Sequence, residues 1–146
     1  MTQALLQVKD LSVRIGQGDS AIRPVDGLSF HIRQGETFAL LGESGCGKSM
    51  TALALLRLLP RPAGEIVSGS VLLNGEELLA FTENGMRSIR GGSIAMIFQE
   101  PMTSLNPVFT IGDQIGEAIQ IHQTAAQNEV DERSAQLLKD VGIAAP

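Results

Sequence analysis

The sequence predicts an α/β fold, and three observations along the chain support that prediction. Two stretches in the first third, Leu5 to Ile15 and Val25 to Arg33, read as strands joined by a loop rich in glycine, aspartate and proline. A short apolar run, Thr37 to Leu41, then leads through a glycine-rich segment into Met50 to Leu59, which has helical apolar spacing. The last third carries two helix-start signals followed by periodic apolar residues, and we expect it to be helical.

The middle of the chain is expected to hold two further strands. Pro60 to Ser68 has the composition of an irregular connection, and Gly69 to Leu73 reads as a strand closed by the turn Asn74-Gly75. Ile94 to Phe98 is a second apolar run, and we expect it to form a buried strand.

Two helices are expected after residue 110, each introduced by a capping pair. Thr110 precedes Asp113 by three residues, and Asn128 precedes Asp131 by the same interval. The expected apolar face of the first helix comprises Ile111, Ile115, Ala118, Ile119 and His122, and that of the second comprises Val130, Ser134, Leu137, Leu138 and Val141.

Length, composition and net charge exclude several classes of protein. It has 146 residues, of which 43% are apolar, and these numbers suit one globular domain. No uninterrupted apolar stretch approaches the roughly 20 residues of a membrane span. The one cysteine excludes an internal disulfide framework, and the net charge of −5 gives no broad basic surface for nucleic acid. Because the sequence also starts without the features of a signal peptide, we expect a cytoplasmic location.

Eight residues have the spacing G-x-x-x-x-G-K-S, which is typical of loops that bind the phosphates of a nucleoside triphosphate: Gly42, Glu43, Ser44, Gly45, Cys46, Gly47, Lys48 and Ser49. Glycines let the backbone curl so that its N–H groups point inward at an anion, and the following helix adds its positive end. Lys48 is expected against the β- and γ-phosphates, and the hydroxyl of Ser49 on a Mg²⁺ ion. The alternative is a glycine-rich turn that happens to carry a lysine. The order strand, loop, helix favours the phosphate-binding interpretation.

A second stretch, Ile94 to Ile119, reads IAMIFQEPMTSLNPVFTIGDQIGEAI. Together with the loop GESGCGKS, it closely resembles the ATP-binding subunits of ABC importers, in the branch that imports dipeptides, oligopeptides and nickel. The resemblance extends over the whole chain. It implies a P-loop NTPase core of the ABC ATPase type, divided into an N-terminal antiparallel β-subdomain (1–36), a P-loop core (37–99) and the start of a helical subdomain (100–146).

The same resemblance implies roles for residues outside the loop. Gln99 would be a catalytic residue with Lys48, and its amide would reach the Mg²⁺ that Ser49 also holds. The alternative for Gln99 is a polar residue at the end of a strand, satisfied by solvent. The surface after Gln99 would receive the membrane-spanning subunits through the apolar residues Met102, Leu105, Val108 and Phe109. Their alternative role is packing beneath the helix that starts at Ile111.

Several elements that an ABC ATPase needs are missing from the sequence. We find no strand ending in an Asp-Glu pair, no suitably placed downstream histidine and no LSGGQ-type signature; the segment from Arg90 to Ser93 resembles that signature but precedes Gln99. We therefore expect the chain to be a truncated, N-terminal half of an ATPase domain. Alone it would be inactive and prone to aggregate, because its sheet edges would be uncovered.

The base of the nucleotide is expected to be held weakly. The family usually stacks the base on an aromatic residue near the end of the first strand, but the chain has no Trp or Tyr, and Ile15 lies near that place. Losing such a stack costs about 1 to 3 kcal/mol. Several charge-assisted hydrogen bonds to phosphate, each contributing about 1.5 to 3 kcal/mol, outweigh that loss.

These observations lead to one expected function. The chain would bind ATP and Mg²⁺ in the motor subunit of an importer for peptides or related small solutes, and hydrolysis would require the absent half. Its partners would be membrane-spanning permease subunits and a second ATPase subunit, at the inner face of the cell membrane. The alternatives are a soluble ABC-type ATPase that works on DNA or the ribosome, and a non-catalytic nucleotide-binding remnant.

Overall fold

A computed structural model describes residues 4–99 and 104–144 of the chain. They belong to two compact units, Met1–Arg90 and Gly91–Pro146. The three expected subdomains, with boundaries at residues 36 and 99, were defined by resemblance to a family and not by compactness. They stay a prediction. Within the described ranges, no helix combines the length and the apolar character that crossing a membrane requires.

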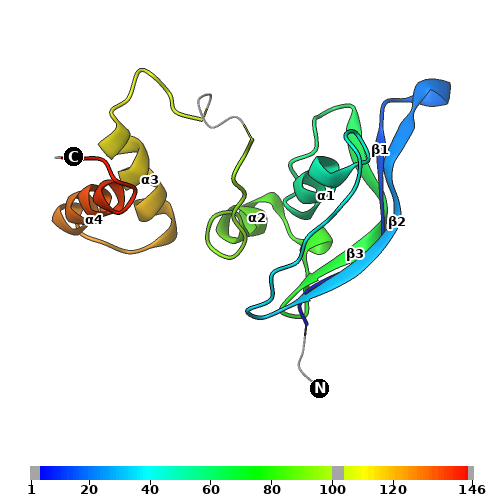
Figure 1. Ribbon diagram of the computed structural model, residues 1–146, viewed down its shortest axis with the longest axis horizontal. Coiled ribbons are helices and arrows are strands. Elements are labelled where there is room, and N and C mark those ends of the chain that lie inside the picture. The colour runs from blue at the N-terminus through cyan, green and yellow to red at the C-terminus, as the bar shows by residue number, and fades with distance from the viewer. Residues whose placement is uncertain (1–3, 100–103, 145–146) are drawn as a thin grey trace. The chain divides into compact units, whose positions relative to one another are not determined.

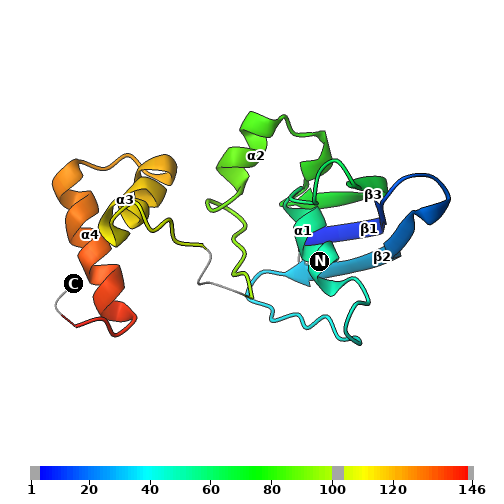
Figure 2. The same ribbon diagram turned by 90° about the horizontal axis from the view of Figure 1, so that it is seen from above.

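The first unit is built on a four-stranded antiparallel sheet of order β2-β1-β3-β4 (Figures 1 and 2). Its strands are β1 (Ala4–Ile15), β2 (Ile22–Arg33), β3 (Gly64–Leu73) and β4 (Glu76–Glu77), and a short 3-10 turn, η1 (Gly18–Ser20), lies in the β1–β2 hairpin. The long central strand β1 pairs with both β2 and β3. The two strands expected in the first third are therefore confirmed.

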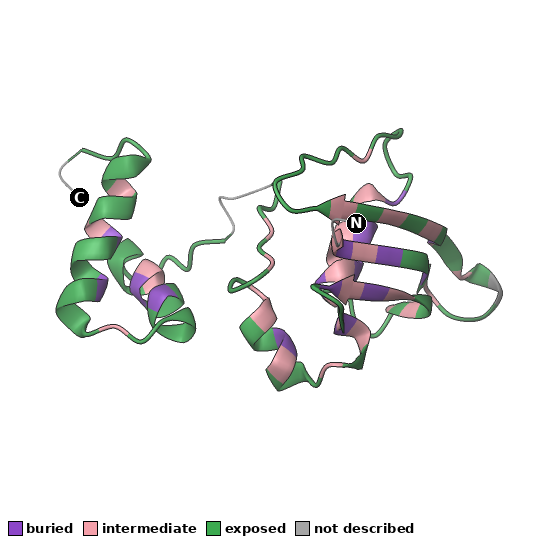
Figure 3. Cartoon of the chain, turned by 90° about the horizontal axis from the view of Figure 1, so that it is seen from below, coloured by how far each residue is buried: buried purple, intermediate pink, exposed green. Residues whose placement is uncertain are grey.

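A β-bulge in β1 keeps its apolar side chains on one face. Leu6 and Val8 precede the bulge, Leu11 and Val13 follow it, and all four are buried. Strand side chains alternate between faces, so an extra residue is needed to bring even and odd positions to the same side. Asp10 is that residue; its φ is 46° and the pairing register shifts beside it. Figure 3 shows buried and more exposed positions alternating along the strands of the sheet.

The helix α1 (Lys48–Leu55) packs on the sheet beside β1 and β2 and buries Thr51 and Ala54. It begins two residues before the expected Met50 and ends four before the expected Leu59. The early end has a local cause. The N–H of Arg57 donates to Ala54 O (3.0 Å) and that of Leu58 to Leu53 O (2.8 Å), with Arg57 at φ 52°. This left-handed reversal satisfies the last carbonyls of the helix and turns the chain away.

The strand β3 is longer than expected. It begins at Gly64 instead of Gly69, so the irregular connection expected for Pro60 to Ser68 is wrong over its second half. The cause is the length of β1, because its last residues, Ser12 to Ile15, supply partners for this part of β3. An ion pair between Arg14 and Glu65 joins the two strands there. The turn at Asn74-Gly75 is confirmed, with positive φ at both residues.

Two apolar runs expected to be buried strands are not strands. Thr37 to Leu41 and Ile94 to Phe98 form neither helix nor strand and are largely exposed; Leu41 is 88% exposed and Ile97 is 95% exposed. Ile94 makes one isolated bridge, and no ladder involving either run appears in residues 4–99 and 104–144. A run that is apolar on both faces becomes a strand only when neighbouring strands pair with it and other layers cover it.

A short helix that the sequence analysis did not predict, α2 (Glu83–Ile89), follows the 3-10 turn η2 (Leu78–Ala80). The hydroxyl of Thr82 accepts a hydrogen bond from Gly85 N at 3.2 Å, and Met86 is fully buried. Asn84 and Gly85 are weak helix formers, so the tertiary burial of Met86 outweighs local propensity.

The second unit contains α3 (Ile111–His122) and α4 (Gln127–Asp140). The cap at Thr110 is confirmed, because its hydroxyl accepts from Asp113 N at 3.1 Å. The expected cap at Asn128 is wrong. The helix α4 begins earlier, with Glu129 reaching back to accept from Ala126 N at 3.0 Å. Each expected apolar face is buried only in part. Ile119 of the first face and Val130 and Ser134 of the second are buried, and so is Gly116, which was not expected.

Glu77 links β3, β4 and η2. Its Oε1 accepts from Val71 N (2.9 Å) and Leu79 N (3.2 Å). Burial raises the pKa of the Glu77 carboxyl, but hydrogen bonds from the Ser70 side chain and from the two backbone N–H groups outweigh it, so the pKa is lowered.

We expect Glu77→Gln to lower the free energy of unfolding by about 1 kcal/mol at neutral pH, because the charged acceptor is lost. The folded-state pKa lies below the unfolded value, so the wild-type contribution is present above the unfolded pKa and disappears as pH falls through the folded one. The difference between wild type and variant should therefore shrink on acidification. Denaturant unfolding of the native-length protein at several pH values measures it. Glu76→Gln is the control, and an equal effect of both substitutions would contradict the prediction.

Candidate functional site

The glycine-rich loop from residue 42 to residue 49 lies between the exposed segment Thr37 to Leu41 and the first turn of α1. The segment before the loop is attached to β2 by two aromatic rings. Phe38 stacks on Phe30 with centroids 4.9 Å apart and planes 9° from parallel. No sequence motif indicated a role for either ring. The stack fixes one approach to the loop.

Gly47 fixes the other end of the loop. It is the N-terminal cap of α1 with φ 93°, and a Cβ at this position would lie 2.0 Å from Pro24 O, at the start of β2. Any side chain would therefore collide with the backbone of the sheet, and the conformation itself favours glycine. Thr51 secures the same residue, because both its N–H (2.8 Å) and its hydroxyl (3.1 Å) donate to Gly47 O.

Lys48 folds back over the loop. Its Nζ donates to the carbonyls of Gly42 (2.8 Å) and Glu43 (2.6 Å) and lies 3.5 Å from Cys46 Sγ. It forms no ion pair with any described carboxylate. The ammonium is therefore held by neutral acceptors, which an incoming anion can replace in part without breaking a salt bridge.

The backbone of the loop offers further donors. The N–H groups of Gly45, Gly47, Lys48 and Ser49 have no acceptor among the described residues. Three of them surround the N-terminal end of α1, where the helix dipole also favours negative charge. Together with the Lys48 ammonium, these groups form an arrangement suited to an oxyanion of several oxygens.

Ser49 is exposed in the first turn of α1, and its hydroxyl makes no hydrogen bond within the described ranges. No group of three or more His, Cys, Asp or Glu side chains in those ranges is arranged to hold a metal ion. Mg²⁺ commonly binds through one or two protein oxygens, with waters and substrate phosphates as its other ligands. A single free hydroxyl beside a loop with unpaired N–H donors is compatible with that mode of binding.

Gln99 is exposed and belongs to the second unit, Gly91–Pro146, so its expected role beside the phosphates stays a prediction. Met102 lies outside the described residues. Leu105, Val108 and Phe109 are 51%, 83% and 59% exposed, so they do not pack beneath α3 as the alternative interpretation required.

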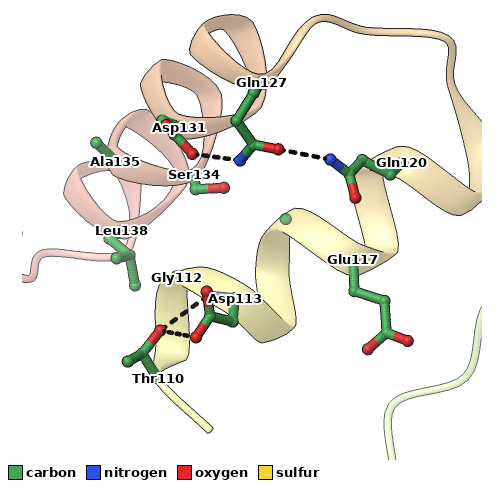
Figure 4. A pocket seen from close by; sticks show the side chains of 11 residues that line it. Thr110, Gly112, Asp113, Glu117, Gln120, Gln127, Asp131, Ser134, Ala135 and Leu138 are labelled. Carbon is green, nitrogen blue, oxygen red and sulfur yellow. Dashed lines mark hydrogen bonds between the residues drawn. The ribbon is translucent and has the colours of Figure 1, made fainter.

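Each of the two units contains a cavity. One of about 270 Å³ lies beside the loop and is lined by Lys48, Cys46 and Thr51 together with β2 residues from Pro24 to Leu28. The other, of about 500 Å³, lies between α3 and α4 (Figure 4). Several of its polar side chains are hydrogen-bonded to one another: Gln120 donates to Gln127, Gln127 donates to Asp131, and Thr110 donates to Asp113.

Comparison with known proteins places the chain in a family. The model of the ABC transporter family matches residues 25–145. The chain belongs to that family. This finding confirms the resemblance seen in the sequence.

Several curated relatives match almost all of the chain. The probable peptide ABC transporter ATP-binding protein y4tR of Sinorhizobium fredii is 48% identical over 142 residues, which are 97% of this chain and 42% of that protein. The oligopeptide transport ATP-binding protein AppD of Bacillus subtilis is 47% identical, over 95% of the chain and 42% of AppD. The peptidoglycan transport ATP-binding protein YejF of Agrobacterium fabrum is 50% identical, over 99% of the chain and 27% of YejF. The chain thus spans less than half the length of these relatives.

Solved structures confirm the expected fold class. A dimeric bacterial ABC transporter cassette has a TM-score of 0.77 at 21% identity, covering 92% of this chain and 56% of the cassette. A post-hydrolysis ATP-binding cassette bound to ADP and Pi has a TM-score of 0.74 at 18% identity, with the same coverage. At these identities the likeness concerns the fold.

We expect the two loop glycines with φ near 90° to differ sharply when replaced by alanine. A Cβ at Gly45 would contact no other atom, so Gly45→Ala should lower the free energy of unfolding only by the cost of a left-handed backbone, about 1 to 2 kcal/mol. Gly47→Ala suffers the same penalty and the collision with Pro24 O, for a total of about 2 to 5 kcal/mol. Equilibrium unfolding of the two variants measures the difference. Equal losses would show that the contact with β2 does not fix the loop.

Proposed function

We propose that this chain binds MgATP as part of the motor subunit of an ABC importer for peptides or related small solutes. The observation that carries the proposal is the loop Gly42 to Ser49, which combines a lysine ammonium, unpaired backbone N–H groups and a free hydroxyl at the start of α1. Each of these groups is suited to one part of a metal-bound triphosphate.

In this proposal Lys48 exchanges part of its bonding to the carbonyls of Gly42 and Glu43 for the β- and γ-phosphate oxygens. The N–H groups of Gly45, Gly47, Lys48 and Ser49 donate to the same phosphates, and the Ser49 hydroxyl serves as one ligand of the metal. Bound Mg²⁺ would neutralise charge on the phosphates. Gln99 would contact the hydrolytic water, and its movement would couple the state of the nucleotide to the helices that follow it.

The transport part of the proposal is supported by the relatives and by the segment before α3. The names of y4tR, AppD and YejF all refer to the transport of peptides, oligopeptides or peptidoglycan. In this chain, Gln114 of α3 ties the backbone of the preceding segment: its side chain accepts from Asn106 N (2.9 Å) and donates to the carbonyls of Asn106 (3.0 Å) and Phe109 (3.2 Å).

An ordered segment that exposes Val108 and Phe109 is suited to contact another protein, because large apolar side chains are costly to leave in water. We propose that membrane-spanning permease subunits bind there, which would place the motor at the inner face of the cell membrane. Hydrolysis would require a second ATPase subunit and the parts of the ATPase that lie outside this chain. A soluble ABC-type ATPase acting on DNA or the ribosome, or a non-catalytic remnant, would bind nucleotide without needing this surface.

We expect Lys48→Ala to weaken MgATP binding by roughly 10- to 100-fold, the effect of removing one charged hydrogen-bonding contact. Ser49→Ala should reduce the gain in ATP affinity that Mg²⁺ provides and leave the affinity in EDTA unchanged. Titration calorimetry of the native-length protein, with and without Mg²⁺, measures both effects. Lys139→Ala, in the last turn of α4, removes the same charge elsewhere and is the control. ATP binding that is indifferent to Lys48 would contradict the proposed site.

We expect Val108→Asp to abolish uptake of a labelled dipeptide by cells that depend on this protein, while MgATP binding in vitro is retained. A charge on the exposed segment before α3 would disrupt an apolar contact with the permease. Val141→Asp is a matched control, because Val141 is 74% exposed, close to the 83% of Val108, and lies at the end of α4. Normal uptake with Val108→Asp would remove the argument for a permease contact there.

A further inference from the structure

A third cavity, of about 370 Å³, lies in the first unit where the chain after α1, the start of β3 and η2 meet. The residues that matter to its chemistry are Arg57, Leu59, Arg61, Glu65, Ile66 and Leu79. It includes no residue of the loop Gly42 to Ser49. For convenience we name it the arginine cavity.

Arg57 occupies an unusual backbone position on the wall of the arginine cavity. It follows α1 with φ 52°, at the place where helices usually have glycine. Its Nη1 donates to Phe81 O at 2.5 Å and lies 3.5 Å from Leu78 O. Its Nη2 and Nε have no acceptor in the described ranges. One edge of the guanidinium is therefore anchored, and the other is available to a ligand.

The carboxylates near the arginine cavity are already paired with other arginines. Glu65 pairs with Arg14, and Glu83 pairs with Arg90 at 2.5 Å. Arg61 makes no hydrogen bond or ion pair with any residue in 4–99 and 104–144. Two guanidinium charges thus remain uncompensated at this place in a chain whose net charge is −5.

The pKa of the Glu83 carboxyl is consistent with a positive potential in this region. It is lowered chiefly by the hydrogen bond from Arg90, and the charges of Arg57 and Arg61 add to the effect.

Apart from the two arginines and Glu65, which pairs with Arg14, the side chains that line the arginine cavity are apolar. Leu59, Ile66 and Leu79 line it and are each half-buried. Its volume falls within the range of small-molecule sites, in which apolar walls surround a few polar groups. An inorganic anion would leave these walls unused. A carboxylate with an apolar body would use both the arginines and the walls.

We propose that the arginine cavity binds a small carboxylate that carries an apolar group, with the carboxylate between Arg57 and Arg61 and the apolar group against Leu59, Ile66 and Leu79. Guanidinium groups are suited to this role, because their N–H donors match the two oxygens of a carboxylate. The site is independent of the nucleotide loop and of the proposed transport function.

Titration calorimetry with N-acetyl-leucine as the probe, on the native-length protein, tests the proposal. We expect saturable binding of one molecule per chain. Arg61→Ala should weaken it by at least about tenfold, the loss expected for one charged hydrogen-bonding contact. Arg57→Gly removes the second guanidinium, provides the residue that the backbone favours, and should have a similar effect. Retained MgATP binding would show that both variants are folded.

Three controls determine the interpretation. Arg87→Ala removes an exposed arginine of the neighbouring α2 that does not line the cavity, and it should leave the affinity unchanged. N-acetyl-leucinamide lacks the carboxylate and acetate lacks the apolar group, so each should bind at least about tenfold more weakly than the probe. Equal losses with Arg87→Ala and Arg61→Ala, equal binding of either control compound, or no saturable binding of the probe would each overturn the proposal.

Discussion

The contact between Gly47 and the carbonyl of Pro24 is the constraint on which the candidate site depends. The β1–β2 hairpin is fixed by pairing along its whole length and by the buried side chains of β1, so Pro24 is part of a rigid surface. Gly47 lies against that surface with no room for a Cβ. Lys48 and Ser49 are the next two residues and the first two of α1, so their positions follow from this contact. A displacement here would move the ammonium, the hydroxyl and the free N–H groups together.

The sequence predicted best those elements whose partners are close along the chain. The β1–β2 hairpin and the Asn74-Gly75 turn are local, and alternation with turn residues was enough to find them. The runs at Thr37 to Leu41 and Ile94 to Phe98 depend on strands far away in sequence, and an apolar run does not say whether those partners are present. The helix α2 was missed because its stability comes from burial of Met86, which no local signal reveals.

In the candidate site, too, the sequence predicted some features and missed others. The motif predicted a glycine-rich loop at the start of a helix, and the structure has one between residue 41 and α1; that residues 42 to 49 bind phosphate stays a prediction. The motif did not predict that Lys48 would bond to Gly42 O and Glu43 O, or that Thr51 would bond to Gly47 O. Thr51 follows the motif by two residues, and on a helix its hydroxyl can reach back to the fourth residue before it; that spacing was the available signal.

Exposed apolar residues in this chain are of two physical kinds. Leu41 and Ile97 belong to segments that pair with no strand in the described ranges, so a neighbouring strand would satisfy both their backbone and their side chains. Val108 and Phe109 belong to a segment whose backbone is already bonded to Gln114 and Asn106, so only their side chains lack a partner. Leu41 and Ile97 are therefore suited to pairing with a further strand of a sheet. Val108 and Phe109 are suited to contact with the surface of another protein.

The two proposed anion sites lie at opposite ends of α1, and the helix dipole acts on them in opposite senses. At the N-terminal end, beside Lys48, the dipole favours an anion by about 0.3 to 1 kcal/mol; at the C-terminal end, beside Arg57, it opposes one by a similar amount. Arg90 reduces that opposition, because its Nε donates to Leu56 O at 2.8 Å and its Nη2 to Arg57 O at 3.4 Å. With the two carbonyls that follow α1 occupied by a guanidinium, the charges of Arg57 and Arg61 determine the potential in the arginine cavity. Arg90 therefore makes an anion possible at the end of the helix that would otherwise repel it.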